Sequence, residues 1–92
     1  MRFEWDETKN ETNKRKHGIS FEEAQTAFLD EEAKVIPDPD HSIDEERFIL
    51  LGLSEKLHLL VVCHCFRESD TVIRIISARK ATTNETKQYD QL

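Results

Sequence analysis

The stretch from residue 72 to residue 82, VIRIISARKAT, constrains the fold more than any other part of the chain. Its first half is rich in β-branched apolar residues, which is the composition of a buried strand. Arg74 interrupts this apolar run, and a buried guanidinium needs an acidic partner or an opening to solvent. The run ends in Arg79 and Lys80, and Thr82 is typical of a helix N-cap. The stretch therefore predicts a core strand that ends in cations and leads into a helix.

The length and composition indicate one folded domain over residues 1–92. Hydrophobic residues make up 37% of the chain and charged residues 35%, and the apolar residues fall into periodic runs, which argues against disorder. The N-terminus lacks the apolar segment of a signal peptide, and no apolar run is long enough to span a bilayer. We therefore expect a cytoplasmic protein with reduced thiols.

The net charge of −6 is distributed unevenly along the chain. Residues 22–46 contain ten acids and one lysine, whereas residues 9–17 contain four cations and one acid. Within the acidic segment, residues 38–45 predict an exposed loop. Opposite charges in separate segments indicate a two-faced surface, and an uneven solvated charge distribution is the alternative.

Capping signals and apolar periodicity predict three helices. Asp6 and Gly18 bound the first, over residues 7–17, and the pair Ser20 and Glu23 is a capping box that opens the second. Thr82 with Glu85 is a second capping box, and it opens a C-terminal helix that carries Tyr89. The second helix has an apolar stripe that we assign to the core, consisting of Phe21, Ala24, Ala27, Phe28 and Leu29.

Apolar runs between turn signals predict the strands. Runs at residues 47–53, 57–67 and 72–79 are separated by tight turns, which is typical of an antiparallel meander. The middle run is apolar on both faces and is expected to be central. Shorter runs at residues 3–5 and 33–36 predict short strands, the first of them at an edge.

Cys63-His64-Cys65 raises the question of a metal site. The two thiols share one face of the predicted strand and His64 occupies the other. Two thiolates without two further ligands do not form a closed zinc site, so we expect small buried cysteines, no metal and no cofactor. With only Gly18 and Gly52, a glycine-rich phosphate loop is also excluded.

The first predicted helix carries a polar face that could hold a phosphate. Lys9, Asn13, Lys16 and His17 recur at i, i+4, i+7 and i+8, so they share this face. A solvated helix face is the alternative interpretation, and it is the more common one.

Arg74 and Arg79 are an odd number of residues apart. They face opposite sides of an ideal strand unless a bulge intervenes, so the spacing leaves open whether they form one clamp. Arg74 also has a purely structural interpretation, an ion pair with an acid such as Glu46 that fixes a loop.

Three segments together resemble the BrnT family of bacterial toxins: FEWD at residues 3–6, KHGISF at 16–21 and RIISARKAT at 74–82. The resemblance implies a type II toxin with an α+β, RelE-like fold, in which two N-terminal helices and a C-terminal helix pack on a small antiparallel sheet. It also implies an endoribonuclease that inhibits translation. The expected partners are RNA and a BrnA-like ribbon-helix-helix antitoxin, and the complex is expected to repress its own operon, so that operator DNA is reached only through the antitoxin.

Metal-independent RNA cleavage uses the 2′-hydroxyl as nucleophile and needs a base, an acid and cations on the phosphorane. His17 is the candidate acid or base, because histidine titrates in the useful range. The arginines can pair phosphate oxygens, and Tyr89 could stack a base or orient a cation. The expected site combines catalytic His17, Arg74, Arg79 and Tyr89 with RNA-binding Lys9, Lys16, Arg47 and Lys80.

We expect this active surface where the first helix meets the end of the 72–79 strand, since both segments carry local positive charge. The alternative function is a non-catalytic module that binds the antitoxin and modulates its grip on DNA. The same cations would then dock the acidic part of a partner.

Overall fold

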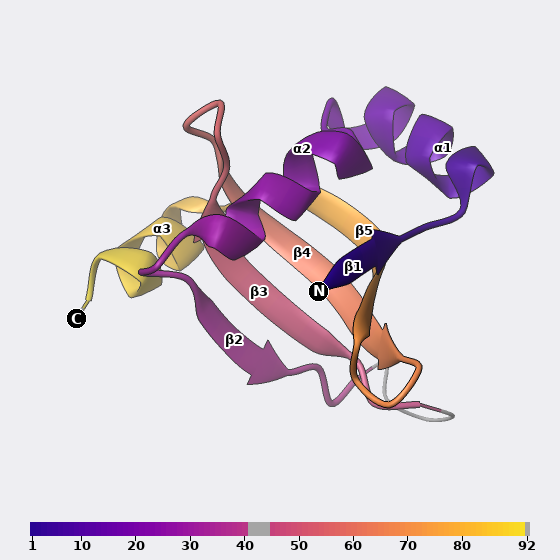
Figure 1. The fold of residues 1–92 in the computed structure, drawn as a ribbon. Coiled ribbons are helices and arrows are strands. Elements are labelled where there is room, and N and C mark those ends of the chain that lie inside the picture. The colour runs from indigo at the N-terminus through magenta and orange to yellow at the C-terminus, as the bar shows by residue number, and fades with distance from the viewer. Residues whose placement is uncertain (41–44, 92) are drawn as a thin grey trace.

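The computed structural model describes residues 1–40 and 45–91 (Figure 1), so residues 41–44 of the predicted 38–45 loop lie outside the described residues. The described residues form five strands and three α-helices, with a short 3-10 turn (η1) after the second helix. Their bounds are β1 Arg2–Glu4, α1 Glu7–His17, α2 Phe21–Thr26, η1 Ala27–Leu29, β2 Lys34–Pro37, β3 Phe48–Leu53, β4 Leu59–Arg67, β5 Val72–Lys80 and α3 Thr83–Asp90.

The five strands form one sheet in the order β1-β5-β4-β3-β2. The meander β3-β4-β5 is antiparallel and β4 is central, as predicted. The prediction of an all-antiparallel sheet is wrong, because β1 pairs with β5 in parallel and makes the sheet mixed. Two helices separate β1 from β2, so no hairpin dictates the direction of β1. The parallel register sets Glu4 opposite Arg74.

A β-bulge in β5 decides which side chains share a face. Cys63 pairs with Ser77 and His64 pairs with Ile75, so Ile76 is the additional residue. One extra residue reverses the alternation of side chains beyond it. Arg74 and Arg79, five residues apart, therefore lie on the same face of β5, the one turned away from the core.

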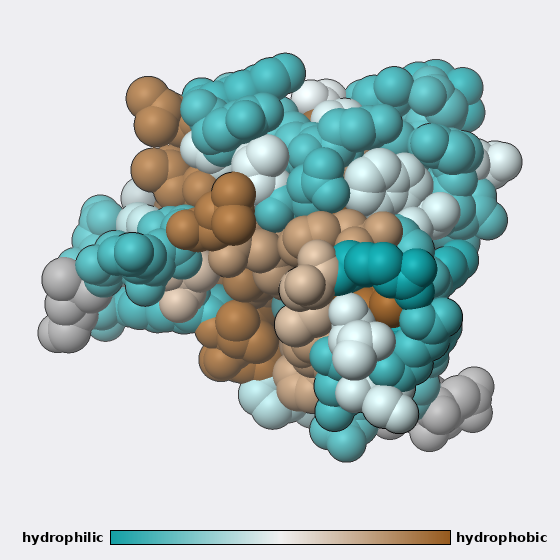
Figure 2. All heavy atoms as spheres, in the orientation of Figure 1, coloured by the Kyte–Doolittle hydropathy of each residue, from teal (hydrophilic) through white to brown (hydrophobic). Residues whose placement is uncertain are grey.

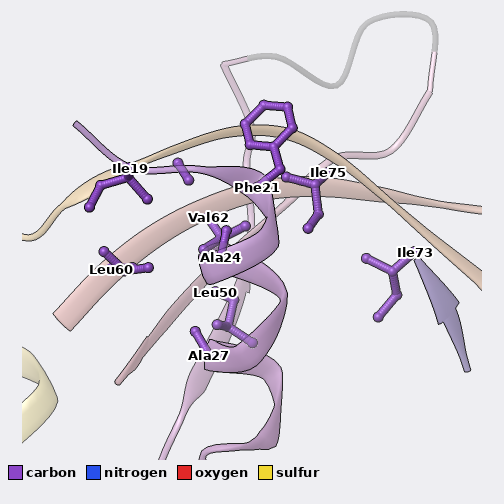
Figure 3. Packing of buried hydrophobic residues seen from close by; sticks show 10 residues of the cluster. Ile19, Phe21, Ala24, Ala27, Leu50, Leu60, Val62, Ile73 and Ile75 are labelled. Carbon is purple, nitrogen blue, oxygen red and sulfur yellow. The ribbon is translucent and has the colours of Figure 1, made fainter. Parts of the chain in front are cut away.

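The core lies between the sheet and the helical segment after α1 (Figure 3). Figure 1 shows the segment formed by α2 and η1 running across the sheet, with α2 against β5 and η1 against β3. The helical segment contributes small side chains and one large ring, and strands β3, β4 and β5 contribute branched residues. The buried cluster consists of Ile19, Phe21, Ala24, Ala27, Leu50, Leu60, Val62, Ile73, Ile75 and Ala78.

The first helix is bounded as predicted. The Asp6 side chain accepts the Lys9 N–H, and Gly18 ends the helix with a φ of 73°. Its polar face is different from the prediction, because Asn13 is buried and turned toward β5. The Asn13 amide donates to the Ala78 carbonyl over 2.7 Å and accepts the Ala78 N–H over 3.1 Å. β1 pairs only with residues 72–74 of β5, and the Asn13 side chain satisfies the backbone groups of β5 further along the strand, at Ala78.

One residue of the predicted apolar stripe, Leu29, lies outside the core, and another, Phe28, packs against the core from its margin. Leu29 is 82% exposed, and Phe28 is half-buried, with its ring against those of Phe3 and His64 at 5.2 and 4.9 Å. The helix tightens into the 3-10 turn η1 at Ala27, which changes the rotation per residue. Leu29 consequently points into solvent.

The two capping boxes have different outcomes. Thr82 and Glu85 form the predicted reciprocal pair at the start of α3. Ser20 accepts the Glu23 N–H as expected, but the Glu23 side chain does not return to the cap. It accepts hydrogen bonds from Ser54 Oγ over 2.6 Å and lies 2.7 Å from His58 Nδ1. The buried Glu23 carboxylate thus ties α2 to the turn after β3.

The C-terminal helix α3 lies against the opposite face of the sheet from α2. It has no buried residue of its own, and it borders an apolar hollow with β2, β3 and β4. Lys34 Nζ donates to the carbonyls of Gln88 and Gln91, and the Tyr89 hydroxyl donates to Asp30 Oδ2 over 2.6 Å. Polar attachments therefore hold α3 in place. No helix among the described residues is long and apolar enough to cross a membrane.

Candidate active site

The face of the sheet turned away from α2 contains a groove of about 270 Å³. Arginines enter it from two strands, Arg47 just before β3 and Arg79 near the end of β5. The remaining lining combines a carboxylate, a thiol and a hydroxyl with an apolar floor. The lining residues are Asp38, Arg47, Ile49, Val61, Cys63, Ile76, Ser77 and Arg79.

Arg79 is held in the groove by the first turn of α3. Its two terminal nitrogens donate to the two carboxylate oxygens of Glu85 over 2.8 and 2.9 Å. The same hydrogen bonds hold the pKa of Glu85 down to about 2 and raise the pKa of Arg79. This bidentate geometry is also the one in which arginine binds a phosphate group.

Arg47 reaches the groove from the segment that leads into β3. Its carbonyl accepts the Asp38 N–H over 2.8 Å, which extends the pairing of β2 with β3 by one step. Its Nε lies 3.8 Å from the Glu45 carboxylate, and Glu45 also pairs with Arg67. The hydrogen bond from Arg67 is the main reason why the pKa of Glu45 is lowered.

Arg74 lies on the same face of β5 as Arg79 but does not line the groove. Its guanidinium donates to Glu4 over 2.8 Å, and both side chains are about a third exposed. The sequence suggested Glu46 as an acid that could pair with Arg74, but Arg74 pairs with Glu4 instead. The parallel pairing of β1 with β5, which the sequence did not reveal, brings that acid beside Arg74.

Asp38 and Cys63 are residues of the groove that the sequence analysis missed. Asp38 is only 5% exposed although it is charged, and the Cys63 sulfur lies 3.9 Å from its carboxylate. Burial is the main reason why the pKa of the Cys63 thiol is raised. The one feature of the sequence that could have pointed to Asp38 is its position between Pro37 and Pro39, because two prolines restrict the backbone around it.

The other predicted site residues lie outside the lining of the groove. Lys9 and Lys16 are exposed on α1, His17 is half-buried at its end, and Lys80 is exposed at the end of β5. Tyr89 is engaged by Asp30, which raises the pKa of its hydroxyl to about 12. These residues are not brought together with Arg47 and Arg79 at the groove, and their roles stay predictions.

The motif Cys63-His64-Cys65 alternates across the sheet as predicted. His64 is buried among the rings of Phe28, Phe48 and Phe66, and burial lowers its pKa, so it belongs to the core of the protein. Both cysteines are free thiols. Among residues 1–40 and 45–91, no group of three histidine, cysteine or acidic side chains could hold a metal ion.

The fold and the groove define a class of small α+β domains in which three helices flank a mixed five-stranded sheet, with arginines on the face that bears α3. The family model described as the ribonuclease toxin, BrnT, of type II toxin-antitoxin systems matches residues 5–85. The chain therefore belongs to the BrnT family of ribonuclease toxins.

A solved structure supports this family assignment. The crystal structure of the Brucella abortus ribonuclease toxin, BrnT, at 1.1 Å resolution is 28% identical to this chain and superposes with a TM-score of 0.70. The match covers 90% of this chain and 99% of that one, so the likeness extends over the whole fold. No curated protein sequence matches the chain.

Proposed function

We propose that this chain is a metal-independent endoribonuclease toxin that inhibits translation by cleaving RNA in the groove. Membership of a family of ribonuclease toxins supports this reaction. The observation that carries the proposal is the entry of Arg47 and Arg79 into one groove on the face that bears α3, with Arg74 on the same face. Three guanidinium groups can follow successive phosphates of one strand.

The reaction that fits such a groove is attack of the ribose 2′-oxygen on the adjacent phosphorus. The new bond between the 2′-oxygen and phosphorus forms as the bond to the 5′-oxygen breaks. The upstream RNA fragment then ends in a cyclic phosphate and the downstream fragment begins with a 5′-hydroxyl. A base takes the 2′-hydroxyl proton and an acid protonates the leaving oxygen. Arg79, released from Glu85 by an incoming phosphate, would neutralise the charge that develops on the phosphorane.

Two groups are candidates for the proton transfers. Asp38 is a carboxylate inside the groove, and His17 is the candidate from the sequence. The two assignments predict that different substitutions, Asp38→Asn or His17→Ala, remove RNA cleavage. Because His17 lies outside the lining of the groove, it can take part only if the bound RNA also reaches the end of α1, and cleavage that persists in His17→Ala would assign the proton transfer to Asp38.

The type II family implies a protein antitoxin as partner. We propose that it is BrnA-like, with a ribbon-helix-helix domain, and that operator DNA is bound only through the toxin-antitoxin complex. We also propose that the toxin is RelE-like and acts in the cytoplasm, as the family resemblance implies.

A second function, a non-catalytic module that binds the antitoxin, is favoured by the ion pairs of the arginines. Arg79 pairs with Glu85 and Arg74 with Glu4, and the chain as a whole is acidic. If these pairs persist in the presence of RNA, the cations serve the fold and a protein partner instead.

Purified, antitoxin-free protein incubated with RNA separates the two functions. We expect cleavage that persists in excess chelator and that falls by about 10²–10³ in rate for Arg79→Ala, the typical cost of removing one donor to a developing oxyanion. Cleavage that disappears with chelator would contradict metal independence. Equal cleavage by wild type and Arg79→Ala would point to a contaminating nuclease and favour the non-catalytic module.

A further inference from the structure

Two exposed leucines lie at the end of the sheet where η1 meets the turn between β3 and β4. Leu29 is 82% exposed at the end of η1, and Leu57 is 76% exposed in the turn between β3 and β4. Figure 2 shows hydrophobic spheres from the region of this turn to the end of the α2 ribbon. Single exposed apolar residues are ordinary, whereas neighbouring ones that form a patch indicate an interaction surface.

The backbone of the β3–β4 turn is strained at Leu57. Its φ is 64°, in the left-handed region that favours glycine and that a branched side chain rarely adopts. The turn is nevertheless ordered, with the Leu57 N–H donating to the Ser54 carbonyl over 2.9 Å. Leu57 combines an unfavourable backbone conformation with an exposed apolar side chain, and both features lower the stability of the folded chain. Strain of this kind at an ordered position is a reason to look for function.

A hollow of about 300 Å³ lies between η1 and the start of this turn. Leu29 and Leu53 form its apolar walls, and Glu55 stands at its rim. It shares no lining residue with the arginine groove. The hollow is lined by Thr26, Leu29, Asp30, Leu53, Ser54 and Glu55.

The charge around this surface selects its partner. Glu31, Glu32 and Glu55 are exposed beside the leucines, and Lys56 is the one cation in residues 29–32 and 53–57. An acidic rim repels a polyanion such as RNA and attracts a cationic chain. An apolar centre with a charged rim is also the usual arrangement of a protein interface.

We propose that this surface docks the antitoxin, through a segment that inserts an apolar side chain into the hollow and carries lysines or arginines against the acidic rim. The proposal rests on the proposed function only in taking the antitoxin as the partner. Because the docking surface and the groove have no residue in common, binding and RNA cleavage can be disabled separately.

Leu57→Gly and Leu29→Ser test the docking surface, with Ile36→Ser as a matched control. Ile36 is also an exposed apolar residue, at 58%, but it lines the hollow beside α3. The probe is the purified BrnA-like antitoxin proposed as the partner, titrated against each variant. We expect each leucine variant to lose about tenfold or more in affinity, as central apolar anchors do, while the control binds like wild type.

Melting temperature and RNA cleavage, measured on the same variants, show whether a loss of antitoxin affinity comes from the docking surface itself. Leu57→Gly relieves the left-handed strain, so its melting temperature is expected to equal or exceed that of wild type, and its RNA cleavage is expected to be unchanged. Unchanged antitoxin affinity in both leucine variants would overturn the proposal while leaving the ribonuclease assignment intact. A wild-type dimer that becomes a monomer in Leu57→Gly would also overturn it, because the surface would then join two copies of this chain.

The acidic rim has its own test. In Glu31→Lys with Glu32→Lys, the rate of antitoxin association is expected to fall and to lose most of its dependence on salt, because rim charges act mainly on the encounter. An association rate that rises or stays the same in this double variant would show that the antitoxin segment is not cationic and would overturn that part of the proposal.

Discussion

The guanidinium of Arg79 donates to both carboxylate oxygens of Glu85, and Glu85 at the same time accepts the Thr82 N–H that opens α3. One carboxylate therefore links the arginine of the groove to the start of the last helix. Because α3 has no buried residue, this link is one of the few attachments that fix it on the sheet. The position of Arg79 and the docking of α3 are consequently coupled.

Arg74→Ala and Arg79→Ala are each expected to abolish growth arrest and to lower the rate of RNA cleavage by about 10²–10³. Both ion pairs are partly exposed, so the free energy of unfolding of each variant should stay within about 1 kcal/mol of the wild-type value. Arg2→Ala is the control, because Arg2 forms an exposed ion pair with Glu68 on the edge strand. Fully toxic, folded arginine variants would contradict the phosphate-binding role, and unfolded ones would assign these cations to the fold.

Glu85→Gln is expected to alter stability in acid. The pKa of Glu85 is lowered from 4.5 to about 2, so its pair with Arg79 stabilises the fold above pH 4.5 and loses this contribution as the pH falls toward 2. Since Arg79 is 41% exposed, solvent screening reduces the effect to about 1 kcal/mol. Urea melts at several pH values should show a smaller loss between pH 4.5 and 2 in the variant than in wild type. The exposed residue Glu32 supplies the control, Glu32→Gln, and identical slopes in all three proteins would refute the coupling.

Asn13→Ala is expected to lower the free energy of unfolding by about 2–4 kcal/mol. The substitution leaves the buried N–H and carbonyl of Ala78 without partners and removes a further bond to the Ile19 carbonyl, and each unsatisfied buried group costs about 1–3 kcal/mol. Lys9→Ala, on the exposed side of the same helix, should change stability by less than about 0.5 kcal/mol. Denaturant melts of the two variants compare the two sides of α1, and similar losses would show that Asn13 does not support β5.

Gly52→Ala and Gly18→Ala are expected to destabilise for different reasons. A Cβ at Gly52 would lie 2.8 Å from the Ala27 carbonyl oxygen, which belongs to the backbone and cannot move aside cheaply. Overpacking of this kind typically costs about 1–3 kcal/mol. A Cβ at Gly18 meets nothing within 4 Å, but the φ of 73° strains an alanine by about 1 kcal/mol. Asparagine should therefore rescue position 18 and not position 52, which thermal melts can check.

Phe21→Ala is expected to cost about 3–5 kcal/mol, because Phe21 is fully buried. Phe28 is half-buried, so Phe28→Ala should cost less, about 2 kcal/mol, mainly through its edge contacts with Phe3 and His64. Comparing the two variants in denaturant melts tests how η1 sets the boundary of the core. A larger loss for Phe28 than for Phe21 would show that the stripe of the second helix enters the core further than the structure indicates.

Local signals in the sequence determined most of the elements of this fold. Asp6, Gly18, Thr82 and Glu85 act through hydrogen bonds and dihedral angles within a few residues of themselves, so the ends of α1 and the start of α3 could be predicted. The two-sided apolar run of β4 identified the central strand for a similar reason, because burial on both faces leaves no polar alternation.

Contacts between distant segments could not be predicted in this way. The bulge at Ile76 exists only relative to the register of β4, yet it decides that Arg74 and Arg79 share a face. The parallel pairing of β1 with β5 places Glu4 opposite Arg74. The hydrogen bond that extends the pairing of β2 with β3 places Asp38 in the groove. A sequence specifies which side chains alternate along a strand, but the face that each one occupies depends on the neighbouring strand, which only the tertiary structure supplies.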